Sequence, residues 1–302
     1  MMVPVILGIS FIIFSIMSLT PGDAARMILG PDATYDQVDA LRAELGLDQP
    51  FLVRYVRYVA NALRLDFGRS YVNNVPVINE IQARFPYTLM LAFGSTLLMV
   101  MIGVPVGIIS AVKQYSVIDN ISLVSALLLT SMPAFWLGPM LTLLFALRLN
   151  WLPAIGVESL RHFILPCVTL AAAMMASLIR MTRSNMLEVV RQDYIRTAKA
   201  KGASERIVIY RHALRNALLP VITIIGLNFG GLLGGTMIIE SCFAMPGLGT
   251  RTIGAIREKD LPVVMATILF IAILGGVINL IVDIIYAFVD PRIKSKYAKS
   301  ST

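Results

Sequence analysis

Long runs of apolar residues, separated by shorter polar segments, follow one another along this chain. An α-helix needs about 20 apolar residues to cross the hydrocarbon core of a bilayer. Only 15% of the residues are charged, against about 25% in soluble domains, so a soluble fold is excluded. We therefore predict an all-α polytopic membrane protein with six transmembrane helices, at residues 3–19, 86–112, 121–147, 163–179, 217–239 and 263–289.

The longest polar segment, residues 20–85, lies between the first two predicted spans and has helical signals of its own. A helix is expected over residues 35–45, because Gly46 follows directly as a helix stop. The segment is nearly balanced in charge. It suits either a surface for a partner protein or an inert connection with short helices.

The loop charges predict the orientation. With the N-terminus inside, the inner segments are residues 113–120, 180–216 and 290–302, with fourteen Lys and Arg against five acids. The outer segments hold twelve basic and twelve acidic residues. Cytoplasmic loops are enriched in Lys and Arg, so both termini are expected in the cytoplasm. Topology thus explains the net charge of +8, and nucleic-acid binding is not needed.

The basic segment, residues 180–216, carries nine of the twenty-six Lys and Arg residues. Its pattern predicts a helix, a turn at Gly202 and a second helix capped by Ser204. The apolar positions at helical spacing are Leu187, Val190, Tyr194 and Ala198, and then Ile207, Tyr210 and Leu214.

Three interpretations of the basic segment compete. A DNA-binding helix-turn-helix is disfavoured, since membrane spans begin within a few residues on both sides. An interfacial amphipathic helix that holds anionic lipid is a second interpretation. The third is a docking element for a cytosolic partner, whose movements would pass directly to the flanking spans.

Within this segment, Ala198, Gly202 and Leu214 keep the spacing of a known pattern. That pattern is Glu-Ala-Ala, three residues, Gly, nine residues, Ile, one residue, Leu-Pro, and the segment resembles this EAA loop of bacterial ABC-importer permeases. The initial Glu-Ala, the Ile and the Pro are absent here. Residues 194–202 and 211–220 instead resemble the dipeptide, oligopeptide and nickel branch of these permeases.

Further short motifs extend the resemblance over nearly the whole chain. Each is weak alone, but their order and spacing fit the same branch. They lie at residues 20–23, 45–50, 65–70, 246–249 and 290–292.

The resemblance implies a division into a first transmembrane helix (1–19), an extracytoplasmic region (20–85) and a permease core (86–302) with a coupling loop at 180–216. It also implies a multi-pass protein of the bacterial or archaeal inner membrane. Expected partners are a second permease, two cytosolic ATPases, an extracytoplasmic substrate-binding protein and membrane lipid. The chain has no phosphate-loop motif, so ATP and Mg are expected on the partner subunits. No enzyme activity, cofactor or metal is expected in this chain.

Two sets of site residues follow. The residues expected to couple to the ATPases are Tyr194, Arg196, Thr197, Ala198, Lys201, Gly202, Ser204, Glu205, Arg206 and Arg211. The candidates for the translocation path are Asn228, Gly230, Gly231 and Gly234. Together with Gly226, the glycines form a small-residue stripe, which equally suits close helix packing within the chain.

The expected cargo is a di- or oligopeptide, and a nickel or metal-chelate importer is the alternative. The only histidines, His162 and His212, are predicted on opposite sides of the membrane, which weakly favours peptide. A secondary transporter or channel is the alternative from another class. It would depend on intramembrane charges, and the spans hold one carboxylate, Asp283, near a cytoplasmic end where a structural ion pair is favoured.

Overall fold

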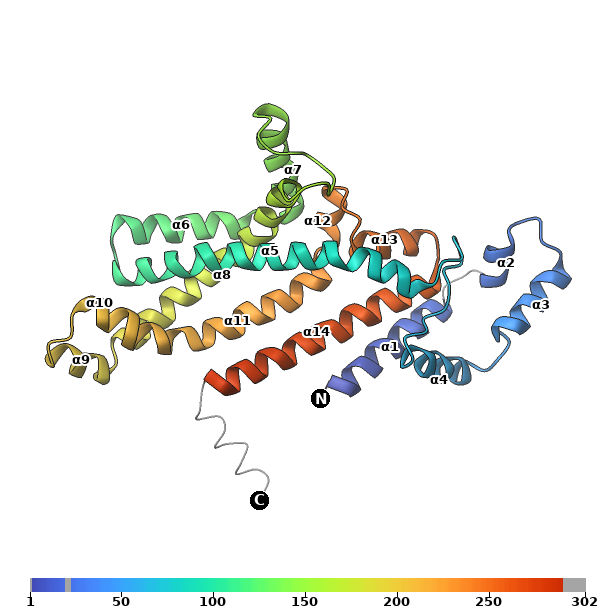
Figure 1. Cartoon of the computed structure of the whole chain (residues 1–302), viewed down its shortest axis with the longest axis horizontal. Coiled ribbons are helices and arrows are strands. Elements are labelled where there is room, and N and C mark those ends of the chain that lie inside the picture. Colours follow the sequence, from blue (N-terminus) through green and yellow to red (C-terminus); the bar gives the residue numbers. More distant parts are fainter. Residues whose placement is uncertain (1, 20–22, 290–302) are drawn as a thin grey trace, which may run out of the picture. The chain divides into compact units, whose positions relative to one another are not determined.

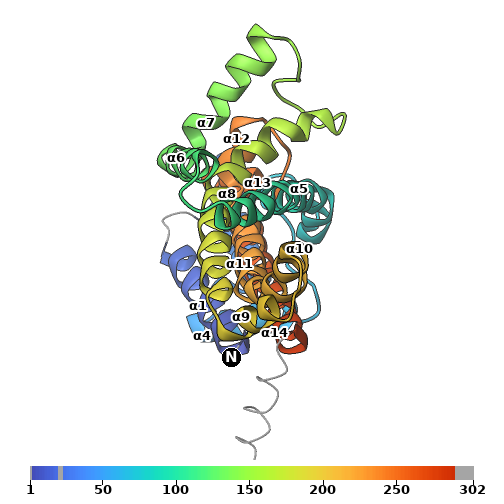
Figure 2. The same ribbon diagram turned by 90° about the vertical axis from the view of Figure 1, so that its left-hand side faces the viewer.

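The computed structural model describes residues 2–19 and 23–289, and within them the chain is built of helices (Figures 1 and 2). The motif at 290–292, most of the motif at 20–23 and the segment 290–302 lie outside the described residues. In chain order the elements are α1 (Met2–Leu19), α2 (Ala24–Leu29), α3 (Tyr35–Leu45), α4 (Phe51–Ala62), α5 (Val77–Val112), α6 (Val117–Ser131), α7 (Ala134–Leu141), the π-helical η1 (Thr142–Arg148), α8 (Arg161–Val190), α9 (Asp193–Ala200), α10 (Glu205–Ile207), the π-helical η2 (Val208–Ala213), α11 (Leu214–Gly235), α12 (Met237–Cys242), α13 (Leu248–Arg257) and α14 (Leu261–Val289).

The chain divides into two compact units. Unit 1 comprises Met1–Thr88 and Pro246–Leu274, and unit 2 comprises Leu89–Met245 and Gly275–Thr302. Helices α5 and α14 are divided between the units: the first part of each helix belongs to unit 1 and the rest to unit 2.

Four helices of the described residues are long and apolar enough to cross a membrane: Val77–Val112, Arg161–Val190, Glu205–Gly234 and Leu261–Ile285. The span predicted over residues 121–147 is broken, because α6 and the run Ala134–Arg148 meet at a bend of 103°. Pro133 accounts for the break: it disfavours helical backbone at the residue before it, and Met132 is extended, with ψ 114°. The first predicted span is an apolar helix that falls short of this length, so the six-span count stays a prediction.

Several helices extend beyond the predicted spans. Helix α5 begins at Val77 instead of residue 86, and α8 continues to Val190 instead of ending at 179. The helical run that includes α11 starts at Glu205 instead of residue 217. Hydropathy marks only the apolar stretch of such a helix, whereas the polar ends continue the same backbone hydrogen bonding. The basic segment is therefore mostly the continuation of two long helices.

Helix α3 confirms the expectation for residues 35–45. Thr34 and Gln37 form a capping box at its start, with each side chain bonded to the other residue's backbone N–H. Gly46 ends the helix at φ +67°, a left-handed conformation that glycine adopts without strain.

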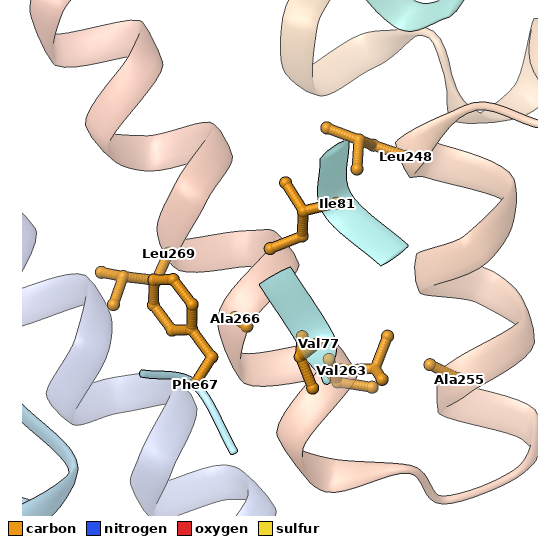
Figure 3. Close-up of a cluster of buried hydrophobic side chains, with 9 residues drawn as sticks. Phe67, Val77, Ile81, Leu248, Ala255, Val263, Ala266 and Leu269 are labelled. Carbon is orange, nitrogen blue, oxygen red and sulfur yellow. The ribbon is translucent and has the colours of Figure 1, made fainter. Parts of the chain in front are cut away.

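The apolar core of unit 1 gathers residues that are distant in sequence (Figure 3). Phe67 comes from the segment before α5, Val77 and Ile81 from the start of α5, Leu248 from α13 and Val263 from α14. All five side chains are at most 6% exposed. This core fixes the three helix ends to one another.

A buried charged group, here called the Arg251 cluster, lies in the same unit. The guanidinium of Arg251 donates to Glu80 at 2.5 Å, to Glu258 at 3.0 Å and to Asp260 at 3.2 Å. Ser70 also donates to Asp260, at 2.5 Å. Arg251 and Asp260 are 8% and 0% exposed. Burial by itself would lower the pKa of Arg251, but the hydrogen bond to Glu80 and the neighbouring acids raise it above its usual value.

Unit 2 contains a close approach between α5 and α8. A Cβ on Gly103 would lie 3.1 Å from Leu178, and one on Gly107 would lie 2.6 Å from Thr182 and 2.9 Å from the carbonyl oxygen of Ile179. These two glycines, four residues apart, therefore let the helix backbones approach each other. This pair of glycines was not predicted, since the predicted glycine stripe lies on α11.

Candidate functional site

The basic segment folds as a turn between two helical arms. Figure 1 shows α9 and α10 side by side at the ends of α8 and α11. Gly202 sits between them at φ +82°, so the predicted glycine turn is confirmed. A Cβ at this position would meet no atom within 4 Å. The glycine is thus required by its backbone conformation and not by crowding.

The first arm differs from the expectation. Residues 187–198 do not form one helix, because α8 ends at Val190 and α9 begins at Asp193. Between them Gln192 has extended backbone, with ψ 149°, and this interrupts the helical hydrogen bonding. Leu187 and Ala198 nevertheless pack on one apolar cluster from two different helices.

That cluster lies beneath the turn and holds both arms together. Met186 of α8, Ile195 of α9 and Val208 of η2 are at most 1% exposed, and Ala111 joins them from the end of α5. Ile195 and Val208 are not among the apolar positions predicted for the two arms. Ile195 had a sequence signal, because it is an apolar residue between Tyr194 and Arg196, whereas Val208 lies between two isoleucines and had none.

The apolar face predicted for the second arm is wrong in part. Ile207 and Tyr210 are 47% and 59% exposed, whereas Val208 and Ala213 are buried. The π-helical turn Val208–Ala213 explains the change, because a π-helix has more residues per turn than an α-helix. It therefore shifts which side chains face inward.

Nine of the ten expected coupling residues lie on an exposed surface, and Ala198 is half-buried. We call these nine residues, together with Ile207 and Tyr210, the docking surface. Arg206, Ile207, Tyr210 and Arg211 line a shallow depression of about 310 Å³ on it. Among the described residues, the one ion pair on this surface is a 3.8 Å contact between Arg196 and Asp193. Cations and two tyrosine rings are thus presented to the exterior.

Ser204 occupies the expected capping position with extended backbone, at ψ 150°. Within the described residues its side chain makes no capping hydrogen bond. Tyr194 is partly fixed, because its hydroxyl accepts a hydrogen bond from Asn216 at 2.9 Å.

A buried ion pair anchors the helices that lead to this surface. Asp119, at the start of α6, is 1% exposed and receives Arg183 Nε at 2.7 Å and Nη2 at 2.8 Å. Ser110 and the backbone N–H of Tyr115 also donate to its carboxylate. We call this the Asp119–Arg183 pair. It ties α5, α6 and α8 together, and Arg183 lies three residues before Met186 of the apolar cluster.

The path candidates on α11 do not share one environment. A Cβ on Gly226 would lie 2.1 Å from Val282 of α14, and one on Gly230 would make ordinary contacts with Asn279 and Ile278. Gly231 and Gly234 are exposed, and a Cβ on Gly231 would meet nothing within 4 Å. One part of the stripe thus packs within the chain and the other part is open.

Two polar groups of the spans were also singled out. Asn228 donates from Nδ2 to the sulfur of Met99 at 3.7 Å. Asp283 is exposed on α14, and no ion pair joins it to another described residue. The structural pair favoured for Asp283 is therefore not found in the described part of the chain.

Residues 103–295 match the family described as "Binding-protein-dependent transport system inner membrane component". The chain belongs to this family of inner-membrane transport components. Residues 1–92 match the N-terminal part described for such proteins.

Curated relatives of this transport component cover almost its whole length. It is 42% identical over 295 residues to the glutathione transport system permease protein GsiC of Escherichia coli (strain K12), covering 98% of this chain and 96% of GsiC. It is 41% identical, with the same coverage, to GsiC of Salmonella paratyphi A.

Solved structures support the fold of this transport component. A chain of the MetNI methionine ABC transporter in an inward-facing conformation superimposes with a TM-score of 0.60 at 20% identity. The match covers 70% of this chain and 97% of the MetNI chain. A second crystal form of the same transporter gives a TM-score of 0.56 at 19% identity.

Together these findings establish the class of this transport component. It is a permease subunit of an ABC importer of the peptide and nickel branch, and it is a multi-pass inner-membrane protein. Proteins of this family work with ATPase and substrate-binding partners and are not themselves enzymes.

Proposed function

We propose that this permease imports short peptides as one half of a paired translocation path. A second permease supplies the other half, and a substrate-binding protein delivers the peptide to the region at residues 20–85. The cargo assignment rests on GsiC, whose name specifies glutathione, a tripeptide. A nickel-chelate cargo has no comparable support among these relatives.

The observation that carries the coupling role is the docking surface. Arg206 and Arg211 flank an exposed tyrosine in a shallow depression, and no acid of the described residues pairs with either arginine. Exposed, uncompensated cations favour association with an acidic surface. We infer that each of two cytosolic ATPases binds such a surface, one on each permease.

The orientation follows from this role. If the basic segment meets cytosolic ATPases, both termini lie in the cytoplasm, as the loop charges predict. ATP and Mg then bind on the ATPases, and this chain needs no cofactor. The path itself is proposed to run along Asn228, Gly230, Gly231 and Gly234. Gly231 and Gly234 are the exposed glycines of this set.

Variants at Gly202 test the docking role. Gly202→Asp is expected to abolish recovery of the ATPases with the permease from solubilised membranes, because it adds a negative charge to a cationic surface. Gly202→Asn is the matched control, since the Asn side chain has nearly the same shape as Asp without its charge. Asn also tolerates positive φ. We expect Gly202→Asn to retain most of the ATPase. Undiminished recovery with Gly202→Asp would contradict the docking role.

The same purified complexes, reconstituted in proteoliposomes with the binding protein, test the cargo. ATP-driven uptake of a labelled tripeptide is expected, and uptake of a nickel chelate is not. Uptake of the chelate alone would overturn the peptide assignment and leave the docking role intact.

A further inference from the structure

Helix α4 has an apolar side that no described residue of its own unit covers. Phe51, Tyr55 and Tyr58 face α1, as ring contacts with Phe14 show. On the remaining apolar side, Leu52, Val53 and Val56 are 64%, 47% and 64% exposed. A surface helix in water normally places polar residues opposite its packed side. Here most of the circumference is apolar.

Contacts between α4 and α1 set the position of this exposed side along α1. The Tyr55 hydroxyl donates to the carbonyl oxygen of Leu7 at 3.1 Å and lies 2.9 Å from Ser10 Oγ. Leu7 precedes Leu19, the last residue of α1, by twelve positions, or about 18 Å at 1.5 Å per residue. Figures 1 and 2 show the two helices alongside each other. Helix α4 thus packs on the middle of α1 and not only on its end.

Helix α1 itself has the surface of a helix in lipid. It contains no charged residue, and Val5, Ile12 and Ile16 are each 58% exposed. The exposed apolar side chains of α4 therefore lie beside a helix that presents the same chemistry. One continuous surface of this kind fits hydrocarbon.

The polar edge of α4 is directed elsewhere. Arg54, Arg57 and Asn61 line a cavity of about 730 Å³ within unit 1. Arg57 donates to Gln49 at 2.9 Å, and the guanidinium of Arg54 lies over the ring of Phe14. Charged groups at membrane depth are tolerated where they face a cavity or reach the interface. The cavity supplies such an environment on the side away from Leu52 and Val56.

We propose that α4 is a helix that faces lipid beside α1. Its apolar side, Leu52, Val53 and Val56, lies in the bilayer next to α1, and its Arg54–Asn61 edge faces the cavity. An apolar side in hydrocarbon, with the charged groups of the same helix turned toward a cavity, is an arrangement that the membrane tolerates. The polar composition of residues 20–85 as a whole gave no indication of this position.

Spin-label accessibility tests this placement in the transporter purified with its partner subunits and placed in nanodiscs. The background is Cys167→Ala with Cys242→Ser, and labels are attached at Val56→Cys or Leu52→Cys. Ile12→Cys on α1 provides the lipid reference, and Asp36→Cys on α3 provides the aqueous reference. Molecular oxygen concentrates in hydrocarbon, whereas a polar nickel complex stays in water.

We expect the labels at positions 52 and 56 to follow the label at position 12, with high oxygen and low nickel accessibility. High nickel accessibility, as expected at position 36, would overturn the proposal and place α4 in water. Low accessibility to both reagents would also overturn it and show that a protein partner covers this side. A label at position 12 without lipid accessibility would equally reject it, because α1 would then lie outside the bilayer.

Discussion

Each unit of this permease contains an arginine that pairs with a buried carboxylate, but the two arginines differ in the number of acids around them. In unit 2, Arg183 meets a single carboxylate, Asp119, through two hydrogen bonds. In unit 1, Arg251 is shared by Glu80, Glu258 and Asp260. A matched buried pair can be exchanged for uncharged groups, whereas a single cation among several acids cannot be removed without leaving buried charge. The units should therefore respond unequally to loss of their arginine.

The largest effect is expected from Arg251→Leu. It leaves Asp260, which is 0% exposed, and Glu80 without their cation, so the free energy of unfolding should fall by about 5 kcal/mol or more. Unfolding in increasing SDS measures this loss. Lowering the pH should recover part of it, because a buried carboxylate without a partner favours its protonated, neutral form. Arg257→Leu is the matched control: the side chain is exposed on the same helix, and little change is expected.

A smaller loss, about 3 kcal/mol, is expected from Arg183→Leu. Only Asp119 is left uncompensated, and Ser110 and the Tyr115 N–H still donate to it. Adding Asp119→Asn to this variant should restore part of the stability, since the buried charge is then removed. The same SDS titration applies. A double variant that is less stable than Arg183→Leu would contradict a charge-based explanation.

The smallest effect is expected from Glu258→Gln. Glu258 is 47% exposed at its side chain, against 8% for Glu80, and solvent-exposed ion pairs contribute about 1 kcal/mol at most. Its unfolding curve should nearly overlay that of the unchanged protein. A loss as large as that of Arg251→Leu would mean that the stability of unit 1 depends on all three acids. It would contradict the expectation that the exposed acid contributes little.

The features that were predicted correctly depend on local sequence signals. Thr34 and Gly46 bound α3, and Gly202 marks the turn, because caps and positive-φ glycines depend on adjacent residues alone. Hydropathy located the apolar stretches for the same reason. The nine exposed coupling residues followed from the resemblance to the EAA loop, whereas helical spacing placed Ile207 and Tyr210 on the apolar face.

Contacts between distant residues account for what was missed. Arg183 and Asp119 are 64 positions apart and Arg251 and Glu80 are 171 apart, so no local pattern pairs them. The break before Pro133 was the exception: the proline was visible, but proline bends are often tolerated within spans, and only the structure shows 103°. The π-helical turn at Val208–Ala213 left no signal that we could identify.

The helical run from Glu205 to Gly234 continues from the docking surface to the open glycines without a break. At 1.5 Å per residue this rod is about 45 Å long. A tilt of only 5° at the end near Gly202 would displace the opposite end by about 4 Å, which is about three-quarters of one helical pitch. The length of this one helical run would then set how far the path end moves for a given tilt at the docking surface.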